Sequence, residues 1–438
     1  MKFDPMNPLP PVTNILIAQT PINIAVERYS KKISCLKIII RLFFRDVYWG
    51  MALRIGIVGT RGLPPEYGGY ETFADHFVKY FEHSDFEILV ACEGRDKTSR
   101  TRTYKGANLF YFPIKPPRNY SLRKIYEGLN DLYYYFFFAR KCDVMFILAG
   151  LGTQLLPLVK LLNPRLRIVT NNDGIEWERE KYGRIEKILW KSFIRSSLSW
   201  SDLVIFDNKE LIERFPKHNT KKSITIEYGV DKPEHIPWEP SIFSEGESTT
   251  PHLRNLRDNE YYVVVARLQK DNNTHQIIEG FLLSESNKNL LIIGDSLDNS
   301  YQKYLELLVP ENAHDRVIFA GGIYDQRKLN MLRQHSFAYL HGHSAGGTNP
   351  SLLEAMVMGK AIVSHNNPFN SNILRDGEIS FSDAESLAKK LRMLESDEKL
   401  RVRTGMNNMI RAEKRFTWER CFEKHNAAFS LLTRLKNP

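Results

Sequence analysis

The sequence predicts an α/β protein with two doubly wound sheets of parallel strands, and three observations carry this prediction. Short apolar runs typical of buried strands alternate with helical patterns from Leu53 onward. The alternation falls into two blocks, which are separated by a stretch at 231–253 that is rich in Pro, Ser and acidic residues. At 438 residues, 42% of them hydrophobic, the chain is long enough for two or three domains.

Each block supplies five apolar runs that we expect to be strands. In the first block these are residues 53–59, 86–92, 143–150, 167–173 and 202–208. In the second block they are residues 261–268, 289–295, 316–322, 337–343 and 361–366. A helix is expected over 70–82, and the aromatic run at 133–138 indicates a helix packed on the first sheet, with membrane contact as the alternative.

We therefore expect an organisation in five parts. These are an N-terminal extension at 1–50, a first Rossmann-like domain at 51–235, a linker at 236–259, a second domain at 260–415 and a terminal amphipathic helix at 416–438. The stretch beginning at Met51 reads like a fresh N-terminus, which places the extension outside the fold, although residues 33–50 could also form an interfacial helix. No stretch reaches the roughly 18 uncharged apolar residues of a membrane span.

Charge and cysteine usage narrow the class of partner and compartment. The formal net charge is +10, and residues 95–124 hold nine Lys or Arg against one Asp. An anionic partner is therefore expected, although charge alone does not choose between nucleic acid, a membrane and a phosphorylated substrate. The four cysteines are far apart and form no C-x-x-C pair, which argues against a disulfide framework or a zinc site and fits a reducing compartment.

A glycine pair precedes a helix in the first block. Gly68 and Gly69 follow the first expected strand, and the helix opens with Tyr70 and Glu71. Ligands bind at the carboxyl ends of strands in such sheets, so this loop is a candidate binding segment. The dinucleotide fingerprint G-x-G-x-x-G is absent because Arg61 occupies the position of its second glycine, which weakens a nicotinamide interpretation. Glu93, which ends the next strand, could hold a ribose, but as an isolated glutamate it is more simply solvent-facing.

The second block has a similar junction at residues 341–356. Asn349 can cap the following helix, with Pro350 at its first position. Ser351 and Glu354 have the spacing of a capping box, which would make Glu354 a structural residue. Neither the N-cap nor the capping box explains the adjacent glycines 346 and 347. Glycines before a helix N-terminus leave the backbone amides open to a ligand, and phosphates are commonly bound in this way.

Arg267 and Lys270 follow the first strand of the second block and could neutralise a diphosphate, the alternative being two solvated surface charges. In the first block, Asp173, Glu176 and Trp177 follow a strand and face the same edge by topology. A carboxylate there could orient an acceptor hydroxyl and the indole could stack on a sugar, or the residues could simply cap the loop and pack.

A histidine pair alternates on the strand 337–343. His341 and His343 would share a face of this strand, as paired metal ligands could. No third ligand is near in sequence and the chain holds no D-x-D, so a core or cleft histidine with satisfied hydrogen bonds is the better interpretation and no metal site is predicted.

Four ordered stretches together carry a family resemblance. GTRGLPPEYGGYETFA (59–74), NNDGIEWEREKYG (171–183), VVARLQKDNN (264–273) and HGHSAGGTNPSLLEAM (341–356) resemble the GT-B, family-4 retaining glycosyltransferases, and within them a bacterial rhamnosyltransferase-like subgroup. The resemblance covers roughly residues 51–435. It implies an acceptor-binding first domain, a donor-binding second domain, a cleft between them and a terminal helix that returns to the first domain near Trp418.

The resemblance also implies roles for individual residues. Glu354, Arg267 and Lys270 would be catalytic. The donor would contact Gly68, Gly69, Tyr324, Gly346, Gly347, Thr348 and Asn349. The acceptor would contact Glu71, Asp173, Glu176 and Trp177.

Two positions depart from the family pattern. Of a spaced pair of family glutamates, Glu354 matches the second but Gly346 replaces the first. Backbone amides at Gly347 and Thr348, or a deoxy-sugar that needs fewer polar partners, could explain the loss. The family's diphosphate lysine is Asn272 here, and Lys270 could take its place.

The expected function is transfer of a hexose or deoxyhexose, rhamnose favoured, from a nucleotide sugar to a lipid-linked precursor of a capsule or O-antigen. No metal, cofactor or nucleic acid is expected. The basic stretch 95–124 predicts reversible attachment to the anionic cytoplasmic face of the bacterial inner membrane, unless it is an ordinary solvated loop. A nucleotide-sugar epimerase, a nicotinamide oxidoreductase and a non-catalytic sugar-nucleotide-binding subunit are the rivals.

Overall fold

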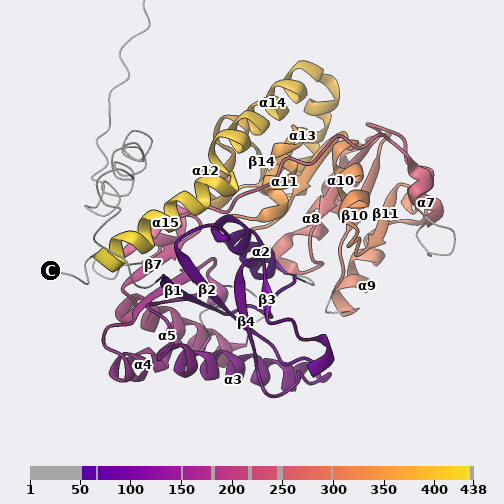
Figure 1. Ribbon diagram of the computed structural model, residues 1–438. Helices are drawn as coiled ribbons and strands as arrows, with labels where there is room; N and C mark the ends of the chain where they lie inside the picture. Colours follow the sequence, from indigo (N-terminus) through magenta and orange to yellow (C-terminus); the bar gives the residue numbers. More distant parts are fainter. Residues whose placement is uncertain are drawn as a thin grey trace, which may run out of the picture.

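A computed structural model describes residues 52–65, 68–148, 151–178, 183–215, 220–243, 250–296 and 299–434. The expected extension at 1–50, with its candidate interfacial helix, lies outside these residues. The described part has two α/β halves, and a long C-terminal helix runs from the second half back over the first (Figure 1).

The first half is built on an eight-stranded sheet with the order β3-β4-β2-β1-β5-β6-β7-β8. Its strands are β1 Leu53–Val58, β2 Phe86–Cys92, β3 Thr103–Tyr104, β4 Ala107–Tyr111, β5 Val144–Ile147, β6 Arg167–Asn172, β7 Leu203–Phe206 and β8 Ser223–Thr225. Every pairing is parallel except that of β3 with β4. The five expected strands are present, whereas β3, β4 and β8 were missed because they are short strands without a long unbroken apolar run.

Among the described residues, five helices belong to this half. They are α2 Gly69–Phe81, α3 Tyr120–Phe138, α4 Leu156–Leu162, α5 Arg184–Trp200 and α6 Lys209–Glu213. The aromatic run lies on α3, where Tyr134, Tyr135 and Phe138 are fully buried against the strands of the first sheet. The expectation that this run packs a helix on the first sheet is therefore confirmed.

The second half has a six-stranded parallel sheet with the order β11-β10-β9-β12-β13-β14. Its strands are β9 Tyr261–Val265, β10 Asn289–Ile293, β11 Val317–Gly321, β12 Ala338–His341, β13 Ile362–His365 and β14 Ile379–Phe381. Its helices are α8 Thr274–Ser284, α9 Asn299–Leu307, α10 Gln326–Gln334, α11 Pro350–Val357, α12 Pro368–Leu374, α13 Ala384–Ser396 and α14 Glu398–Arg415. The short helix α7 Thr250–Arg254 precedes them, and the three-residue strand β14 was not expected from the sequence.

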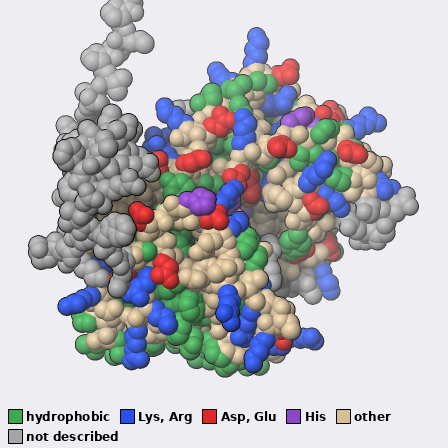
Figure 2. All heavy atoms as spheres, viewed as in Figure 1, with side chains coloured by type: hydrophobic (Ala, Val, Ile, Leu, Met, Phe, Trp, Pro, Cys, Tyr) green, Lys and Arg blue, Asp and Glu red, His purple; other side chains and the backbone are tan. Residues whose placement is uncertain are grey.

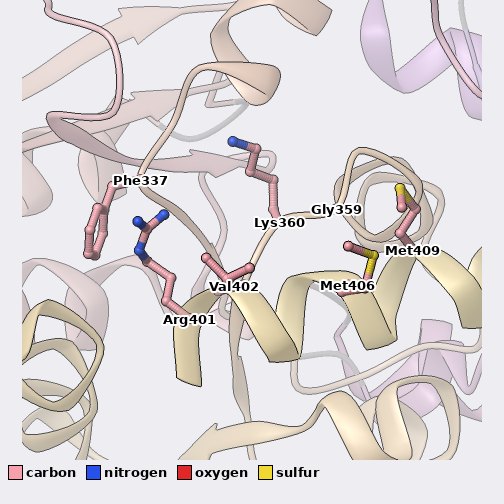
Figure 3. A pocket seen from close by; sticks show the side chains of 8 residues that line it. Phe337, Gly359, Lys360, Arg401, Val402, Met406 and Met409 are labelled. Carbon is pink, nitrogen blue, oxygen red and sulfur yellow. The ribbon is translucent and has the colours of Figure 1, made fainter. Parts of the chain in front are cut away.

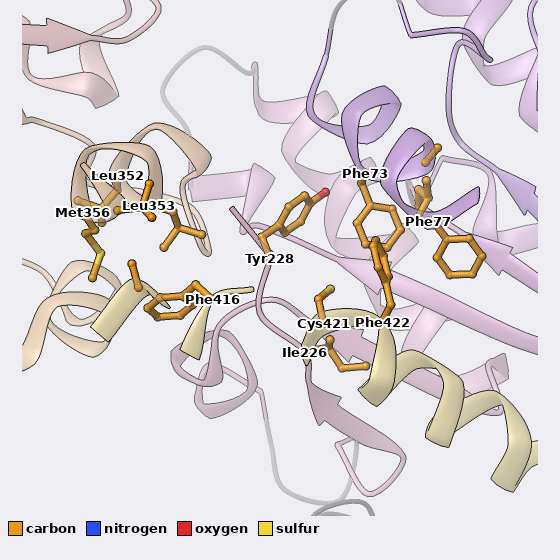
Figure 4. Packing of buried hydrophobic residues seen from close by; sticks show 14 of the residues in the cluster. Phe73, Phe77, Ile226, Tyr228, Leu352, Leu353, Met356, Phe416, Cys421 and Phe422 are labelled. Carbon is orange, nitrogen blue, oxygen red and sulfur yellow. The ribbon is translucent and has the colours of Figure 1, made fainter. Parts of the chain in front are cut away.

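The terminal helix α15 (Trp418–Arg434) joins the two halves. Its rings pack on α2: Phe422 lies 5.5 Å from Phe73 and 5.6 Å from Phe77 between ring centroids. Figure 4 shows these rings beside Tyr228, with Leu353 of α11 on the other side of the same cluster. The predicted return of the terminal helix to the first domain is confirmed, and it makes one apolar core continuous across both halves. Within the described residues, none of the helices has the length and apolar character needed to cross a membrane.

Candidate functional site

The loops that follow β9, β10, β11 and β12 form a connected rim at the carboxyl edge of the second sheet. Leu268 donates its amide to the carbonyl of Asp295 (3.0 Å), which links the first two loops. Asp295 Oδ1 accepts from the Gly322 amide (2.8 Å), which adds the third loop. Ser344 donates its amide to the carbonyl of Asp271 (3.0 Å), which adds the fourth. The rim is thus the edge at which ligands bind in open α/β sheets.

The glycine loop before α11 is seated on the first half. The Gly347 amide donates to the carbonyl of Asp173 (3.0 Å), at the end of β6. The Thr348 amide donates to Asp207 Oδ2 (2.8 Å), and the Thr348 hydroxyl donates to the carbonyl of Asp207 (2.6 Å), beyond β7. The carboxyl edges of the two sheets therefore face each other and are in direct contact.

This contact corrects the predicted role of the two amides. In this arrangement the amides of Gly347 and Thr348 donate hydrogen bonds to Asp173 and Asp207 of the first half. They therefore do not take the place of the missing family glutamate. Gly347 has a different reason to be glycine, because a Cβ there would lie 1.8 Å from Asp207 Oδ1. Gly346, by contrast, has a φ of 126°, a conformation that favours glycine for its own backbone.

Asp207 is a residue that the sequence reasoning missed. Its side chain is buried and its Oδ1 has no hydrogen-bond partner among the described residues. Burial raises the pKa of this carboxyl well above its usual value, nearby Asp173 raises it further, and the hydrogen bond from Thr348 opposes both. The signal available in the sequence was an acid directly after a buried strand, the same signal that identified Asp173.

The start of α11 uses one of the two predicted caps. Asn349 is the N-cap: its Oδ1 accepts from the Ser351 amide (3.0 Å), and Pro350 follows at the first position. The capping-box alternative is wrong, because Ser351 already lies inside the helix and its hydroxyl donates to the carbonyl of Val265 (3.2 Å). Asn349 is occupied as a cap, and contact with a donor stays a prediction for it.

Glu354 lies one turn into α11 and pairs with a buried arginine. Its Oε2 is 2.5 Å from Arg333 Nη2, on α10. The Arg333 side chain is 2% exposed, and its Nε and Nη1 have no hydrogen-bond partner among the described residues. Glu354 itself is 30% exposed at the rim. Glu354 therefore neutralises a buried charge, and its contact with a ligand hydroxyl stays a prediction.

Arg267 and Lys270 are both exposed in the loop after β9. Asn272, which stands where the family has its lysine, is buried and donates its amide to the carbonyl of Arg267 (2.7 Å). Asn272 thus braces this turn and is not a diphosphate ligand in this arrangement. The two cations are displayed on the rim, and their contact with a diphosphate stays a prediction.

Tyr324 lies at the end of the rim formed by the loop after β11. Its hydroxyl donates to Asp295 Oδ2 (2.5 Å), and the ring is largely exposed. A flat exposed ring at the edge of this rim is suited to stacking on a nucleobase. Tyr324 thus belongs to the same rim as Arg267 and Lys270, and its contact with a donor stays a prediction.

The glycine loop before α2 in the first half makes its contacts within its own domain. Glu71, in the first turn of α2, is buried and its Oε1 accepts from the Arg61 amide (2.8 Å). Gly68 has a φ of 135°, and a Cβ there would lie 1.9 Å from Glu71 Oε2. A Cβ at Gly69 would meet nothing within 4 Å. Glu71 therefore holds the loop, and its contact with an acceptor stays a prediction.

Glu93 lies on the neighbouring loop, and the expectation that it faces solvent is wrong. It is buried rather than solvent-facing, and its carboxylate pairs with Arg123 (2.6 Å). Burial raises the pKa of Glu93, and the Arg123 guanidinium opposes that rise.

The predicted acceptor residues lie on the first half, next to the glycine loop of the second. Asp173 Oδ1 accepts from the Tyr70 hydroxyl (2.8 Å), which ties the loop after β6 to α2. Trp177 is half-buried, with its ring 5.9 Å from that of Phe215, so part of its surface is used in packing. The side chain of Glu176 lies outside the described residues.

His341 and His343 stack at the carboxyl end of β12, with ring centroids 4.5 Å apart. His341 is buried, as expected of a core histidine, but neither of its ring nitrogens has a hydrogen-bond partner among the described residues. The expectation of a satisfied histidine is therefore wrong for His341. Burial lowers its pKa well below the usual value, so the ring is neutral. Within the described ranges, no group of three or more His, Cys, Asp or Glu is placed to hold a metal ion.

A cavity of about 220 Å³ lies elsewhere in the second half, at the amino edge of its sheet (Figure 3). Phe337, Lys360, Arg401 and Met406 are among its lining residues. Burial lowers the pKa of Lys360 to about 8, and its ammonium donates to the carbonyl of Ser336 (2.8 Å). This cavity is separate from the rim at the carboxyl edge.

Comparisons with known proteins agree with this geometry. Residues 250–410 match the family described as Glycosyl transferases group 1, and residues 53–231 match Domain of unknown function DUF1972. A capsular polysaccharide biosynthesis glycosyltransferase, CapM of Staphylococcus aureus, is 26% identical over 183 residues, which are 39% of this chain and 47% of CapM. The chain thus spans about half the length of that curated relative.

Solved structures share the fold. HepE from Anabaena, in complex with UDP, has a TM-score of 0.63 at 15% identity and covers 87% of this chain and 100% of its own. Sucrose-phosphate synthase from Thermosynechococcus elongatus has a TM-score of 0.68 at 14% identity with the same coverage. The two parallel α/β sheets and the returning terminal helix are therefore a GT-B fold, as predicted from the sequence.

Proposed function

We propose that this chain is a retaining glycosyltransferase that uses a nucleotide sugar, because residues 250–410 match the family described as Glycosyl transferases group 1 and the chain has a GT-B fold. The observation that carries the proposal is the meeting of the two carboxyl edges. Gly347 and Thr348 are hydrogen-bonded to Asp173 and Asp207 of the other half. Arg267, Lys270 and Tyr324 lie along the same rim, and Glu354 lies in the helix α11 that follows the glycine loop. A donor on that rim would have its sugar next to the residues of the first half.

The chemistry follows from the charges on the rim. Arg267 and Lys270 would neutralise the departing diphosphate, and stabilisation of charge at the leaving group is usually the largest electrostatic contribution to catalysis. Glu354 would accept a hydrogen bond from a ribose or sugar hydroxyl, and Tyr324 would stack on the base. Attack would come from the face of the leaving phosphate, and no metal ion would be required.

The donor and acceptor are proposed from the relatives. HepE binds UDP and UDP-glucose, and CapM is a capsular polysaccharide glycosyltransferase. We take the donor to be a nucleoside diphosphate hexose or deoxyhexose, with rhamnose favoured by the sequence resemblance. The acceptor would be a lipid-linked capsule or O-antigen precursor, reached from the cytoplasmic face of the bacterial inner membrane.

Calorimetric titration with UDP, UDP-glucose and nucleoside diphosphate rhamnoses tests the donor half of the proposal. At least one of them should bind, and Arg267→Ala should weaken that binding about tenfold to a hundredfold, since a charge-assisted hydrogen bond contributes about 1.5–3 kcal/mol. The matched control is Arg403→Ala, which removes an exposed arginine of α14 away from the rim. Equal losses in both variants would contradict the assignment of Arg267.

Product analysis with a lipid-linked acceptor separates the rival functions. Transfer of the sugar only when acceptor is present supports the proposal. Turnover of the donor to a different nucleotide sugar without acceptor would indicate an epimerase instead. Donor binding with neither reaction would indicate a non-catalytic subunit, which the glycine at position 346 makes a specific rival.

A further inference from the structure

The outer faces of α3, α4 and α5 carry apolar side chains that no described element covers. Each helix shows an exposed apolar stripe at helical spacing, opposite the stripe that packs on the sheet. The exposed residues are Leu122, Ile125 and Leu129 on α3, Leu158, Leu161 and Leu162 on α4, and Ile185, Ile188 and Leu189 on α5. Leu161 and Ile185 are 77% and 76% exposed. We call these nine residues the apolar face.

The apolar face is one surface rather than three separate stripes. The Lys124 ammonium of α3 lies 3.0 Å from Glu186 Oε1 of α5, which joins the first turns of the two helices. α4 contacts both α3 and α5. Figure 2 shows apolar side chains gathered along the lower side of the molecule, where Figure 1 places these three helices, with Lys and Arg side chains around them. Contiguous exposed apolar surface of this kind marks an interaction site.

Positive charge borders the apolar face. α5 carries Arg184, Lys187, Lys191 and Arg195 against one acid, Glu186, which pairs with Lys124. Exposed Arg140 and Lys141 follow the end of α3. Apolar side chains surrounded by Lys and Arg match the boundary of an anionic lipid bilayer, whose acyl region accepts the former and whose headgroups attract the latter.

The face also opens beside the site. α3 follows β4 and α5 follows β6, so both helices begin at the carboxyl edge of the first sheet, the edge that meets the donor half. A bilayer on the apolar face would therefore present a lipid-linked acceptor beside Asp173 and the loop it supports.

We propose that the apolar face of α3, α4 and α5 docks on an anionic membrane surface. The identity of the lipid-linked acceptor there rests on the proposed function. This surface differs from the basic stretch 95–124, which was predicted from the sequence as the site of membrane attachment. Four of the cations in that stretch form ion pairs within the protein. Lys105 pairs with Asp75 (2.7 Å), Lys115 with Asp96, Arg123 with Glu93 and Lys124 with Glu186.

Vesicle co-sedimentation of the full chain tests the docking face. The vesicles are an equimolar mixture of phosphatidylcholine and phosphatidylglycerol, with pure phosphatidylcholine as the neutral comparison. The variant Leu161→Glu/Ile185→Glu/Ile188→Glu should lose at least tenfold in binding to the anionic vesicles. Its matched control is Val402→Glu/Met406→Glu/Ile410→Glu, on an exposed apolar stripe of α14 in the other half, which should bind as the parent does.

A second pair of variants tests the charge. Lys187→Gln/Lys191→Gln/Arg195→Gln should lose roughly a hundredfold at low salt, since each cation near an anionic surface contributes about fivefold. Lys399→Gln/Arg403→Gln/Lys414→Gln on α14 is the matched control. Raised salt should weaken binding of the parent protein.

Three outcomes would overturn the proposal. The first is that the apolar-face variant binds vesicles as the parent does. The second is that the parent binds neutral and anionic vesicles equally. The third is that the parent is a dimer, the apolar-face variant is a monomer and neither binds vesicles. UDP affinity, measured on the same samples, keeps the two proposals apart. If the parent does not bind UDP, the proposed function is contradicted, but the result on membrane docking is unaffected.

Discussion

Two junctions of this molecule look alike in sequence and differ in what they do. Each has a glycine pair at the carboxyl edge of a sheet, at or shortly before the start of a helix with a glutamate in its early turns. In the first half, Glu71 turns back to the Arg61 amide and fills the space that Gly68 leaves, so the loop is closed within its own domain. In the second half, Gly347 and Thr348 donate to Asp173 and Asp207, so the loop is closed by the other domain.

The difference teaches that a glycine pair before a helix indicates close approach without saying what approaches. At Gly68 it is a carboxylate of the same helix, and at Gly347 it is a carboxylate more than a hundred residues away. The contacts of the first junction stay within one domain. Those of the second junction connect the two domains. Substitutions should therefore have domain-local effects in the first and effects on domain closure in the second.

The largest effect should come from the early-turn glutamates. Glu354→Ala leaves the buried Arg333 guanidinium without its carboxylate and should destabilise the protein by about 3 kcal/mol, the lower end for a broken buried pair because Glu354 is partly exposed. Glu71→Ala removes the acceptor of the Arg61 amide (2.8 Å) and of the Thr60 hydroxyl (3.5 Å) and should cost about 1–2 kcal/mol. Chemical denaturation measures both.

The double variant Arg333→Met/Glu354→Ala separates structure from function at the second junction. It should recover most of the stability, because the unpaired charge is gone, but no glycosyl transfer. Recovery of transfer together with stability would mean that Glu354 serves only as the partner of Arg333 and never touches the donor.

The next effect should come from the glycines. Gly347→Ala forces a Cβ against the Asp207 carboxylate, and overpacking of this kind costs about 1–3 kcal/mol. The cost should appear as separation of the two halves, measured by the distance between probes attached to each half, together with loss of transfer. Gly69→Ala is the matched control, since its Cβ meets nothing within 4 Å. Equal behaviour of the two variants would show that the contact at Gly347 does not hold the halves together.

An effect that is small at any single pH, and that grows with the pH range, should follow from Asp207. Its folded pKa lies above the unfolded value near 3.9, so the stability it contributes is fully present below that value and is lost as pH rises through the folded pKa. Asp173 and Glu227 act in the same direction by repelling the ionised carboxylate. Unfolding free energies from pH 4 to 8 should show a slope of up to about 1.4 kcal/mol per pH unit for this single proton.

Asp207→Asn is the control for that slope, since the amide oxygen can still accept from Thr348. The variant should match the parent near pH 4 and exceed it in stability at higher pH. Parallel curves over the whole range would mean that Asp207 is ionised in the folded protein and that an unrecognised cation balances it.

The smallest effect is expected from chelation. In the part of the chain that the structure describes, neither junction brings together three metal-ligating side chains, and Arg267 and Lys270 can carry the charge of the diphosphate. EDTA should leave the transfer rate nearly unchanged. A loss of rate that manganese or magnesium restores would contradict this prediction.

Most of the fold could be predicted from local pattern, because buried parallel strands and amphipathic helices are encoded within a few consecutive residues. The strands around Ile57 and Val263 and the helix carrying Phe73 are examples. Short strands such as β4 and β14 could not, since three to five residues of mixed polarity carry no periodic signal. Arg267 could be placed at this edge from topology, because it follows the end of a strand. The roles of Tyr324 and Glu354 came from the family resemblance and stay predictions.

By itself the sequence determined the two sheets, the order of their elements and the edge at which the candidate site lies, since these depend on periodicity and on the direction of parallel strands. Only the tertiary structure decided what each polar group at that edge contacts. Asp207 under Thr348, Arg333 under Glu354 and Arg123 on Glu93 are pairs between distant segments. Burial makes an unpaired charge or amide costly, so such partners are chosen by packing in three dimensions, and no spacing along the chain encodes them.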